Sequence, residues 1–361
     1  MKKVLLTAMA IVTLASASAF GMYGNADGWI DFLVHGNQLR ARMNQLGFTL
    51  GNGTIKGTFG FKSDTSSWMA NILKAQTGDN ASKNVILGST ISLGLGYTSD
   101  AFGIGVGYNY TYISQNRGIH TPVLTVNALN DNLRIAVPIQ IAVGDKAGQK
   151  DYMGIRTDIQ VRYYTGIDVF NAVRFYLNYG QQSYNDGTAL KTEHAASSLG
   201  LQLRLYFLNT YINNVNINPY LKLVYSTSLT GNNNNVNSWD GKAPVKNSNN
   251  DTGSYSFTIA PVLGLGASTD IVSVWFEPSI GYNVSGAKNS AVTHQLAWGA
   301  YAELYLTPVK DLEWYFEVDV NNQNPNNVND SVYGNNPPAN GVNFAASTGI
   351  TWYLPSLNGA E

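Results

Sequence analysis

The chain has 361 residues, of which 12% are charged and 12% aromatic, and its formal net charge is −1. This balance lacks the basic excess of nucleic-acid-binding proteins, and the absence of cysteine excludes disulfides, thiol catalysis, cysteine-ligated metals and a lipid-modified cysteine anchor. The mean hydropathy is −0.12 and no internal run approaches 18 apolar residues, so we do not expect membrane-spanning helices. A mean near zero suits a membrane barrel, because its apolar outer face and polar inner face cancel.

The N-terminus has the pattern of a secretory signal peptide. Two lysines precede the apolar segment Val4–Leu14, and Ala17 and Ala19 form an A-x-A cleavage site. We therefore expect residues 1–19 to be cleaved and residues 20–361 to form one barrel domain.

Alternation of apolar and other residues predicts strands along most of the remaining chain. Trp29–His35 and Leu39–Leu50 are the first two, and a one-residue shift of the apolar pattern near Asn44 predicts a β-bulge in the second. The strands expected after these are the segment of Ile55, Gly57, Phe59 and Phe61, the two arms of Val85–Tyr112, and then Ile119–Ala128, Leu133–Val143, Met153–Tyr163, Val169–Gly180, Ala196–Leu208, Asn216–Leu229, Tyr255–Ala267, Ile271–Ser285, Val292–Leu306, Leu312–Asn321 and Val342–Leu354. Prolines inside four of these runs, at positions 138, 219, 261 and 278, predict local weaknesses or bulges.

The hairpin Val85–Tyr112 shows the alternation most clearly. One face of each arm is largely apolar or aromatic, and each arm is long enough to cross a bilayer at a tilt. Gly103, Gly105 and Gly107 lie on the other face with a strict period of two, which indicates a wall without side chains rather than a phosphate-binding loop. The loop Ser63–Asn84 is the nearest candidate for a plug resting on that wall.

Strand direction predicts which connections lie on which side of the membrane. Barrel strands alternate in direction, with short periplasmic turns and long extracellular loops. The connections placed outside are Gly144–Tyr152, Gln181–Ala195, Thr230–Thr252 and Asn322–Gly341, and those placed inside are Thr165–Asp168, Thr269-Asp270 and Pro308–Asp311. The fold class is therefore an all-β, transmembrane antiparallel β-barrel of about 16 strands, with about 14 as the alternative if the first two segments do not both pair.

The last apolar alternating segment carries a further barrel signal. Ser347, Gly349, Trp352 and Leu354 resemble the polar, glycine, aromatic and hydrophobic positions of the terminal-strand signal of bacterial outer-membrane barrels. This resemblance implies recognition by the barrel-assembly machinery. The chain departs from the pattern by the tail Pro355–Glu361, where the signal often ends the protein.

Residues Phe20–Gly47, together with the segment GTIKGTFGFKS at Gly53–Ser63 and the TWYLP end, resemble the variable surface proteins of intestinal spirochaetes of the Brachyspira type. The resemblance implies a surface-exposed antigen of the bacterial outer membrane, made in several variant copies. It brings no catalytic or binding motif onto positions of this chain.

Charged residues on the inward-facing positions form two groups. The basic wall consists of Arg156, Arg162, Arg174, Arg204 and Lys222, and the acidic wall consists of Glu277, Glu303, Glu313, Glu317 and Asp319. Walls of opposite charge, several strands apart, would set a field across a water-filled lumen, as in diffusion porins. The alternative is that these charges pair across a plugged interior. A barrel of about 16 strands is wide enough for an aqueous channel.

The sequence leaves three functions open: a variable surface antigen, a diffusion porin for small hydrophilic solutes, or an adhesin. None of the four histidines has metal-ligand spacing and no recognisable catalytic set occurs, so we expect no enzyme, no cofactor and no metal site. The expected partners are outer-membrane lipid, the assembly machinery and host antibodies or matrix, and a homo-oligomer is open. The outer loops are rich in asparagine, which is typical of solvated surface.

Overall fold

The computed structural model describes residues 39–42, 45–51, 54–63, 89–99, 101–114, 117–310, 312–322 and 342–354. These residues form seventeen antiparallel strands in one sheet, and no helix among them is long and apolar enough to cross a membrane. The strands are β1 (Leu39–Arg42), β2 (Gln45–Gly51), β3 (Ile55–Ser63), β4 (Ser89–Thr98), β5 (Phe102–Ser114), β6 (Arg117–Ala128), β7 (Leu133–Val143), β8 (Lys150–Ile167), β9 (Phe170–Asn185), β10 (Glu193–Phe207), β11 (Thr210–Ile212), β12 (Val215–Thr230), β13 (Tyr255–Ser268), β14 (Val272–Gly286), β15 (Thr293–Val309), β16 (Leu312–Asn321) and β17 (Asn343–Leu354).

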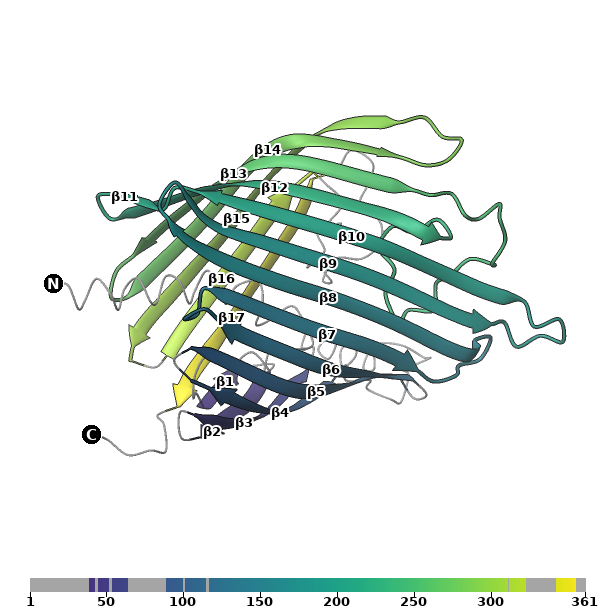
Figure 1. Ribbon diagram of the computed structural model, residues 1–361, viewed down its shortest axis with the longest axis horizontal. Helices are drawn as coiled ribbons and strands as arrows, with labels where there is room; N and C mark the ends of the chain where they lie inside the picture. The colour runs from purple at the N-terminus through teal and green to yellow at the C-terminus, as the bar shows by residue number, and fades with distance from the viewer. Residues whose placement is uncertain are drawn as a thin grey trace, which may run out of the picture.

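The sheet closes on itself into a wide barrel (Figure 1). Each strand pairs with its neighbours in the sequence, and β1 pairs with both β2 and β17. The three-residue strand β11 continues the path of β10 along β12, so the seventeen strands occupy sixteen positions around the ring. The predicted antiparallel barrel of about 16 strands is confirmed.

The first two strands differ from the prediction. Arg42 pairs with Gln45, so Leu39–Leu50 is a hairpin of β1 and β2 rather than one bulged strand. In a hairpin, residues paired across the strands share a face, which produces the same one-residue shift in the apolar pattern as a bulge. The prediction of a β-bulge is therefore wrong, and the predicted strand Trp29–His35 lies outside the described residues.

The two faces of the barrel differ in polarity. On β4, Leu93 and Leu95 are more than half exposed at the outer face, whereas Ser92, which precedes Leu93, is 2% exposed at the inner face. Val106 and Asn109 on β5 show the same contrast. Because a strand sends successive side chains to opposite faces, this alternation covers the outside of the ring with apolar side chains. In a membrane barrel, that surface contacts lipid.

The connections also divide as expected between the two ends. Short turns such as 99–101, 129–132 and 168–169 lie at the end where β1 begins and β17 ends, on the left in Figure 1. Longer connections such as 186–192 and 231–254 lie at the opposite end. Because short turns face the periplasm in outer-membrane barrels, the end with the longer connections faces the cell exterior.

Each of the prolines at positions 138, 219, 261 and 278 lies at a local gap in the strand pairing. Between β13 and β14 the pairing skips from Ile259 to Val262, across Pro261, and resumes in the same register. Pro138 on β7 lies in a similar gap opposite β8. Since proline has no amide hydrogen to donate, a short gap in the ladder is the expected consequence. Pro219 and Pro278 each keep a paired partner on one side, Leu263 and Ala300, and lie in a gap of the pairing on the other side.

Candidate lumen site

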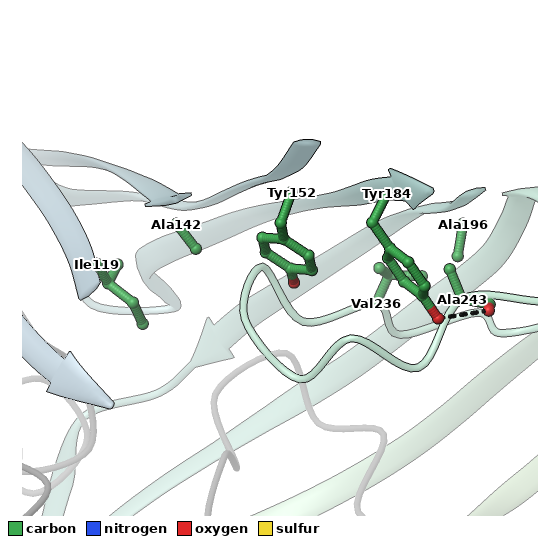
Figure 2. Packing of buried hydrophobic residues seen from close by; sticks show 7 residues of the cluster. All are labelled: Ile119, Ala142, Tyr152, Tyr184, Ala196, Val236 and Ala243. Atoms are coloured by element: carbon green, nitrogen blue, oxygen red, sulfur yellow. Dashed lines mark hydrogen bonds between the residues drawn. The ribbon is translucent and has the colours of Figure 1, made fainter. Parts of the chain in front are cut away.

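The connection between β12 and β13, residues 231–254, folds back against the inner wall of the barrel, and we call it the inserted loop. Val236 and Ser238, near its centre, are 0% exposed. Figure 2 shows Val236 and Ala243 of this loop beside Tyr152 and Tyr184, whose side chains point from the barrel wall toward it. The expectation that Thr230–Thr252 lies wholly outside is therefore wrong for its central part. The amide groups of an asparagine-rich segment form hydrogen bonds with water, but they can equally form them with a polar wall.

Aromatic side chains on β8, β9 and β10 hold the backbone of the inserted loop. The Tyr152 hydroxyl donates to the Ser238 carbonyl oxygen at 2.7 Å, and the Tyr184 hydroxyl lies 3.1 Å from the Ala243 carbonyl oxygen. The imidazole of His194 stacks on the Tyr184 ring with centroids 4.8 Å apart, and its Nδ1 lies 2.9 Å from the same Ala243 oxygen. These contacts satisfy buried loop carbonyls that would otherwise lose their hydrogen bonds to water.

Arg117 at the start of β6 joins the inserted loop to two wall elements. Its guanidinium carbon lies 3.3 Å above the Tyr152 ring, and its Nη1 donates to the Trp239 carbonyl oxygen at 3.0 Å. The same group donates to the Gly144 carbonyl oxygen in the turn between β7 and β8. Burial and the nearby charge of Arg117 lower the pKa of Lys146 in that turn. The arginine is 2% exposed, so its role is structural: it links the loop to the barrel wall.

Two glycines on the inner wall allow the loop backbone to approach closely. A Cβ atom added to Gly154 on β8 would lie 1.6 Å from the Ser238 oxygen, and one added to Gly180 on β9 would lie 1.9 Å from the Val236 oxygen. Any side chain at either position would therefore displace the loop. Glycine in a strand often marks the close approach of another backbone. The two glycines within predicted strands were therefore a sequence signal for the docked loop, which was not predicted.

Arg156, assigned to the basic wall, contacts the inserted loop directly. Its Nη1 donates to the side-chain oxygen of Asn237 at 2.7 Å, and its Nε lies 3.1 Å from a carboxylate oxygen of Asp158. Asp158 lies two residues along the same strand, so the ion pair forms within the wall and not across the lumen. Both side chains are about nine-tenths buried.

The other four residues of the basic wall form one continuous row. Arg162 pairs with Arg174, Arg174 pairs with Arg204, and Arg204 pairs with Lys222 in direct cross-strand register. Arg134 on β7 extends the row, because it lies opposite Arg162. Arg134 was not among the residues predicted for the basic wall. We call these five residues the cationic row.

Tyrosine rings flank the cationic row. The guanidinium carbon of Arg174 lies 4.7 Å from the Tyr206 ring centroid, and that of Arg204 lies 5.2 Å from the Tyr176 ring centroid. Tyr206 in turn packs on Tyr220 with centroids 4.6 Å apart. Guanidinium stacking on an aromatic face is attractive and orients the group. The row is therefore held as a fixed layer on the inner wall of β7 to β12.

The acidic wall lies on β14 to β16 and begins closer to the basic wall than expected. Glu277 and Glu303 are buried, and Glu303 accepts a hydrogen bond of 2.5 Å from the Tyr301 hydroxyl. Tyr220 on β12 donates to Glu277 on β14 at 3.1 Å. The hydrogen bond spans β13, so the two walls meet across one strand and are not separated by several strands. The remaining members of the wall are Glu313, Glu317 and Asp319, which alternate with outward residues along β16.

The residues of the terminal-strand signal all lie in β17. Ser347 pairs with Glu317 and Gly349 with Tyr315 on β16, while Trp352 pairs with Ala41 and Leu354 with Leu39 on β1. The end of the signal therefore lies at the seam that closes the barrel. The predicted cleavage residues Ala17 and Ala19 lie outside the described residues, and so does the predicted plug apart from Ser63, which ends β3.

The closed sheet, its apolar outer face and its polar inner face define an integral outer-membrane β-barrel protein. The family model described as Serpulina hyodysenteriae variable surface protein matches residues 2–242 and 242–353. The chain belongs to this variable surface protein family. It is accordingly a surface-exposed protein of the bacterial outer membrane, as the resemblance in the sequence implied.

The comparison with solved structures gives matches of low similarity over most of the chain. OmpT of Vibrio cholerae is 10% identical with a TM-score of 0.39, and the match covers 85% of this chain and 99% of that one. The translocator domain of the autotransporter NalP from Neisseria meningitidis is 13% identical with a TM-score of 0.32, and the match covers 95% of this chain and 98% of that one. No curated protein matches the chain.

Proposed function

We propose that this protein acts as a surface antigen, with antibody contacts concentrated on three exposed loop tips. The observation that carries the proposal is the exposure of residues 187–191, 245–249 and 288–292 at the outer end of the barrel. Leu190, for example, is 90% exposed. Loops at such positions tolerate sequence change, because most of the surface of their side chains lies in solvent. The buried centre of the inserted loop does not share this freedom.

Protease treatment of intact cells tests the display of these tips. Trypsin should cleave after Lys191, Lys246 and Lys288, one in each tip, because all three lysines are exposed. Lys310 is also exposed but lies in the turn at the opposite end, so it is a matched control that intact cells should protect. Cleavage at Lys310 with protection of the three tips would show that the orientation is reversed.

Serum from a colonised host tests the antigen role itself. The serum should bind intact cells, and binding should fall when all three tips are replaced by glycine-serine segments of equal length. A matched replacement of the turn 129–132, at the other end, should leave serum binding unchanged. Full serum binding to the variant that lacks the three tips would contradict the proposal.

A second candidate function is a pore for small hydrophilic solutes. It is favoured by the polar inner face and by the contrast between two parts of the wall. The inserted loop covers the inner wall of β6 to β10, whereas four inner-face positions of β4 and β5, Gly94, Gly96, Gly103 and Gly105, carry no side chain. A path through the lumen beside the loop would pass solutes. Conductance of the purified protein in a planar bilayer tests this function, and absence of a channel at every salt concentration would refute it.

A further inference from the structure

The cationic row places like charges directly opposite one another on five neighbouring strands. Its order is Arg134, Arg162, Arg174, Arg204 and Lys222. Directly opposite side chains have Cβ atoms about 4.5–5.5 Å apart, and like charges at that distance destabilise a sheet. Other positions on the same face of each strand would keep these cations apart. Their placement in register therefore indicates that they share a negatively charged group.

The centre of the row contains hydrogen-bond donors without acceptors among the described residues. Nε of Arg174 and the hydroxyl of Tyr176 are buried and have no hydrogen-bond partner there. Arg174 is 7% exposed and Tyr176 is 1% exposed, so water does not replace the missing acceptors at the surface. The two residues lie on the same face of β9, one position apart along that face. Buried donors of this kind are rare in native proteins, which makes their proximity informative.

The chemistry of these donors selects the class of ligand. Guanidinium groups bind oxyanions with charge-assisted hydrogen bonds, and a phenol hydroxyl can add a further donor. A cation would be repelled by the row. A lipid phosphate would have to reach the inner face, whereas the lipid contacts the apolar outer face. Arg134, at the β7 end of the row, has a side chain that is 25% exposed, so solvent reaches the row from that end.

We propose that the cationic row is a binding site for a small oxyanion, such as phosphate or the carboxylate of a small solute, centred on Arg174 and Tyr176. The anion accepts from the Arg174 Nε and the Tyr176 hydroxyl and lowers the repulsion between Arg174 and its neighbours in the row. The stacked tyrosines keep the guanidinium planes in place when the site is empty. The site is independent of the antigen role and does not require net transport.

Titration calorimetry with inorganic phosphate on the full chain, folded in detergent micelles, tests the site. The unchanged protein should bind phosphate saturably, with chloride at equal ionic strength as the reference. Arg174→Gln should weaken binding about tenfold to a hundredfold, because it removes a charge-assisted donor. Tyr176→Phe should weaken it about threefold to tenfold, because only a neutral hydroxyl is lost.

Lys56→Gln is the matched control, because Lys56 is also a buried cation on the inner face but lies on β3, away from the row. It should leave phosphate binding unchanged. Absence of saturable binding, equal binding by Arg174→Gln, or equal weakening by Lys56→Gln would each overturn the site. Heat-modifiable migration checks folding, and if Arg174→Gln does not fold, loss or retention of affinity in Tyr176→Phe decides the outcome.

Discussion

The two glycines beneath the inserted loop allow its docking to be tested directly. In a Gly154→Ala, Gly180→Ala double variant, the new Cβ atoms would lie 1.6 Å and 1.9 Å from carbonyl oxygens of the loop. Non-bonded contacts need about 3.5 Å, so the loop backbone must move away by roughly 1.5–2 Å. That movement breaks the hydrogen bond from Tyr152 to the Ser238 carbonyl oxygen and the bond from the Val236 amide to Ser198.

Loss of these two hydrogen bonds sets the expected magnitude. At about 1 kcal/mol each, they contribute about 2 kcal/mol to docking, which corresponds to about 30-fold more of the undocked loop. The chain has no cysteine, so a Ser238→Cys substitution introduces a single thiol at a position that is 0% exposed. Maleimide labelling of this thiol in the folded protein should be about 30-fold faster in the double-glycine variant.

A glycine on the outer face serves as the control for the added methyl groups. A Cβ atom at Gly57 on β3 would meet Leu95 at 3.6 Å, which is ordinary contact, so Gly57→Ala should leave the labelling rate unchanged. The reasoning would be refuted if the double variant folds, by heat-modifiable migration, and labels at the rate of the parent. That result would mean that the loop does not rest on the wall.

Three further substitutions test other parts of the barrel, each by the urea midpoint of the refolded protein in detergent or lipid. Leu93→Arg places a charge on the lipid face and should destabilise the protein in lipid by about 2–4 kcal/mol, whereas Leu190→Arg in an exposed loop should have no effect. Arg156→Gln leaves the buried Asp158 without its ion-pair partner and should cost about 3 kcal/mol; an unchanged midpoint would contradict the pairing. Tyr220→Phe removes a hydrogen bond to Glu277 and should cost about 1–3 kcal/mol, and a smaller loss would indicate that the two walls do not meet there.

The strands could be predicted from the sequence because a period of two is visible within each segment. The segment Ile119–Ala128 was among the predicted strands, and it forms most of β6. The period of two also placed Arg174 and Glu303 on the inner face, where they lie. Local periodicity could not distinguish the hairpin of β1 and β2 from a bulged strand, because both shift the apolar pattern by one residue.

The inserted loop could not be predicted from local patterns. Its contacts join residues far apart in the sequence, such as Tyr152 and Ser238, and the acceptors are backbone carbonyls that carry no sequence signature. An asparagine-rich segment looks the same whether it is solvated or bonded to a wall. The alignment of the cationic row could not be predicted either, because the register between two strands is not known until the turn that joins them is known.

The seam between β1 and β17 has a consequence for assembly. Four residue pairs close the ring, whereas the pairing of β9 with β10 has fifteen. Leu39 and Leu354, which meet at this seam, are about 300 residues apart, and bringing the ends of so long a flexible chain together costs about 5 kcal/mol in loop-closure entropy. Four pairs barely offset that cost unless the intervening hairpins have already formed and brought the ends close. The ring must therefore close last, and until it does, the edge of the terminal strand at Thr351–Leu354 is unpaired and open to the cellular machinery.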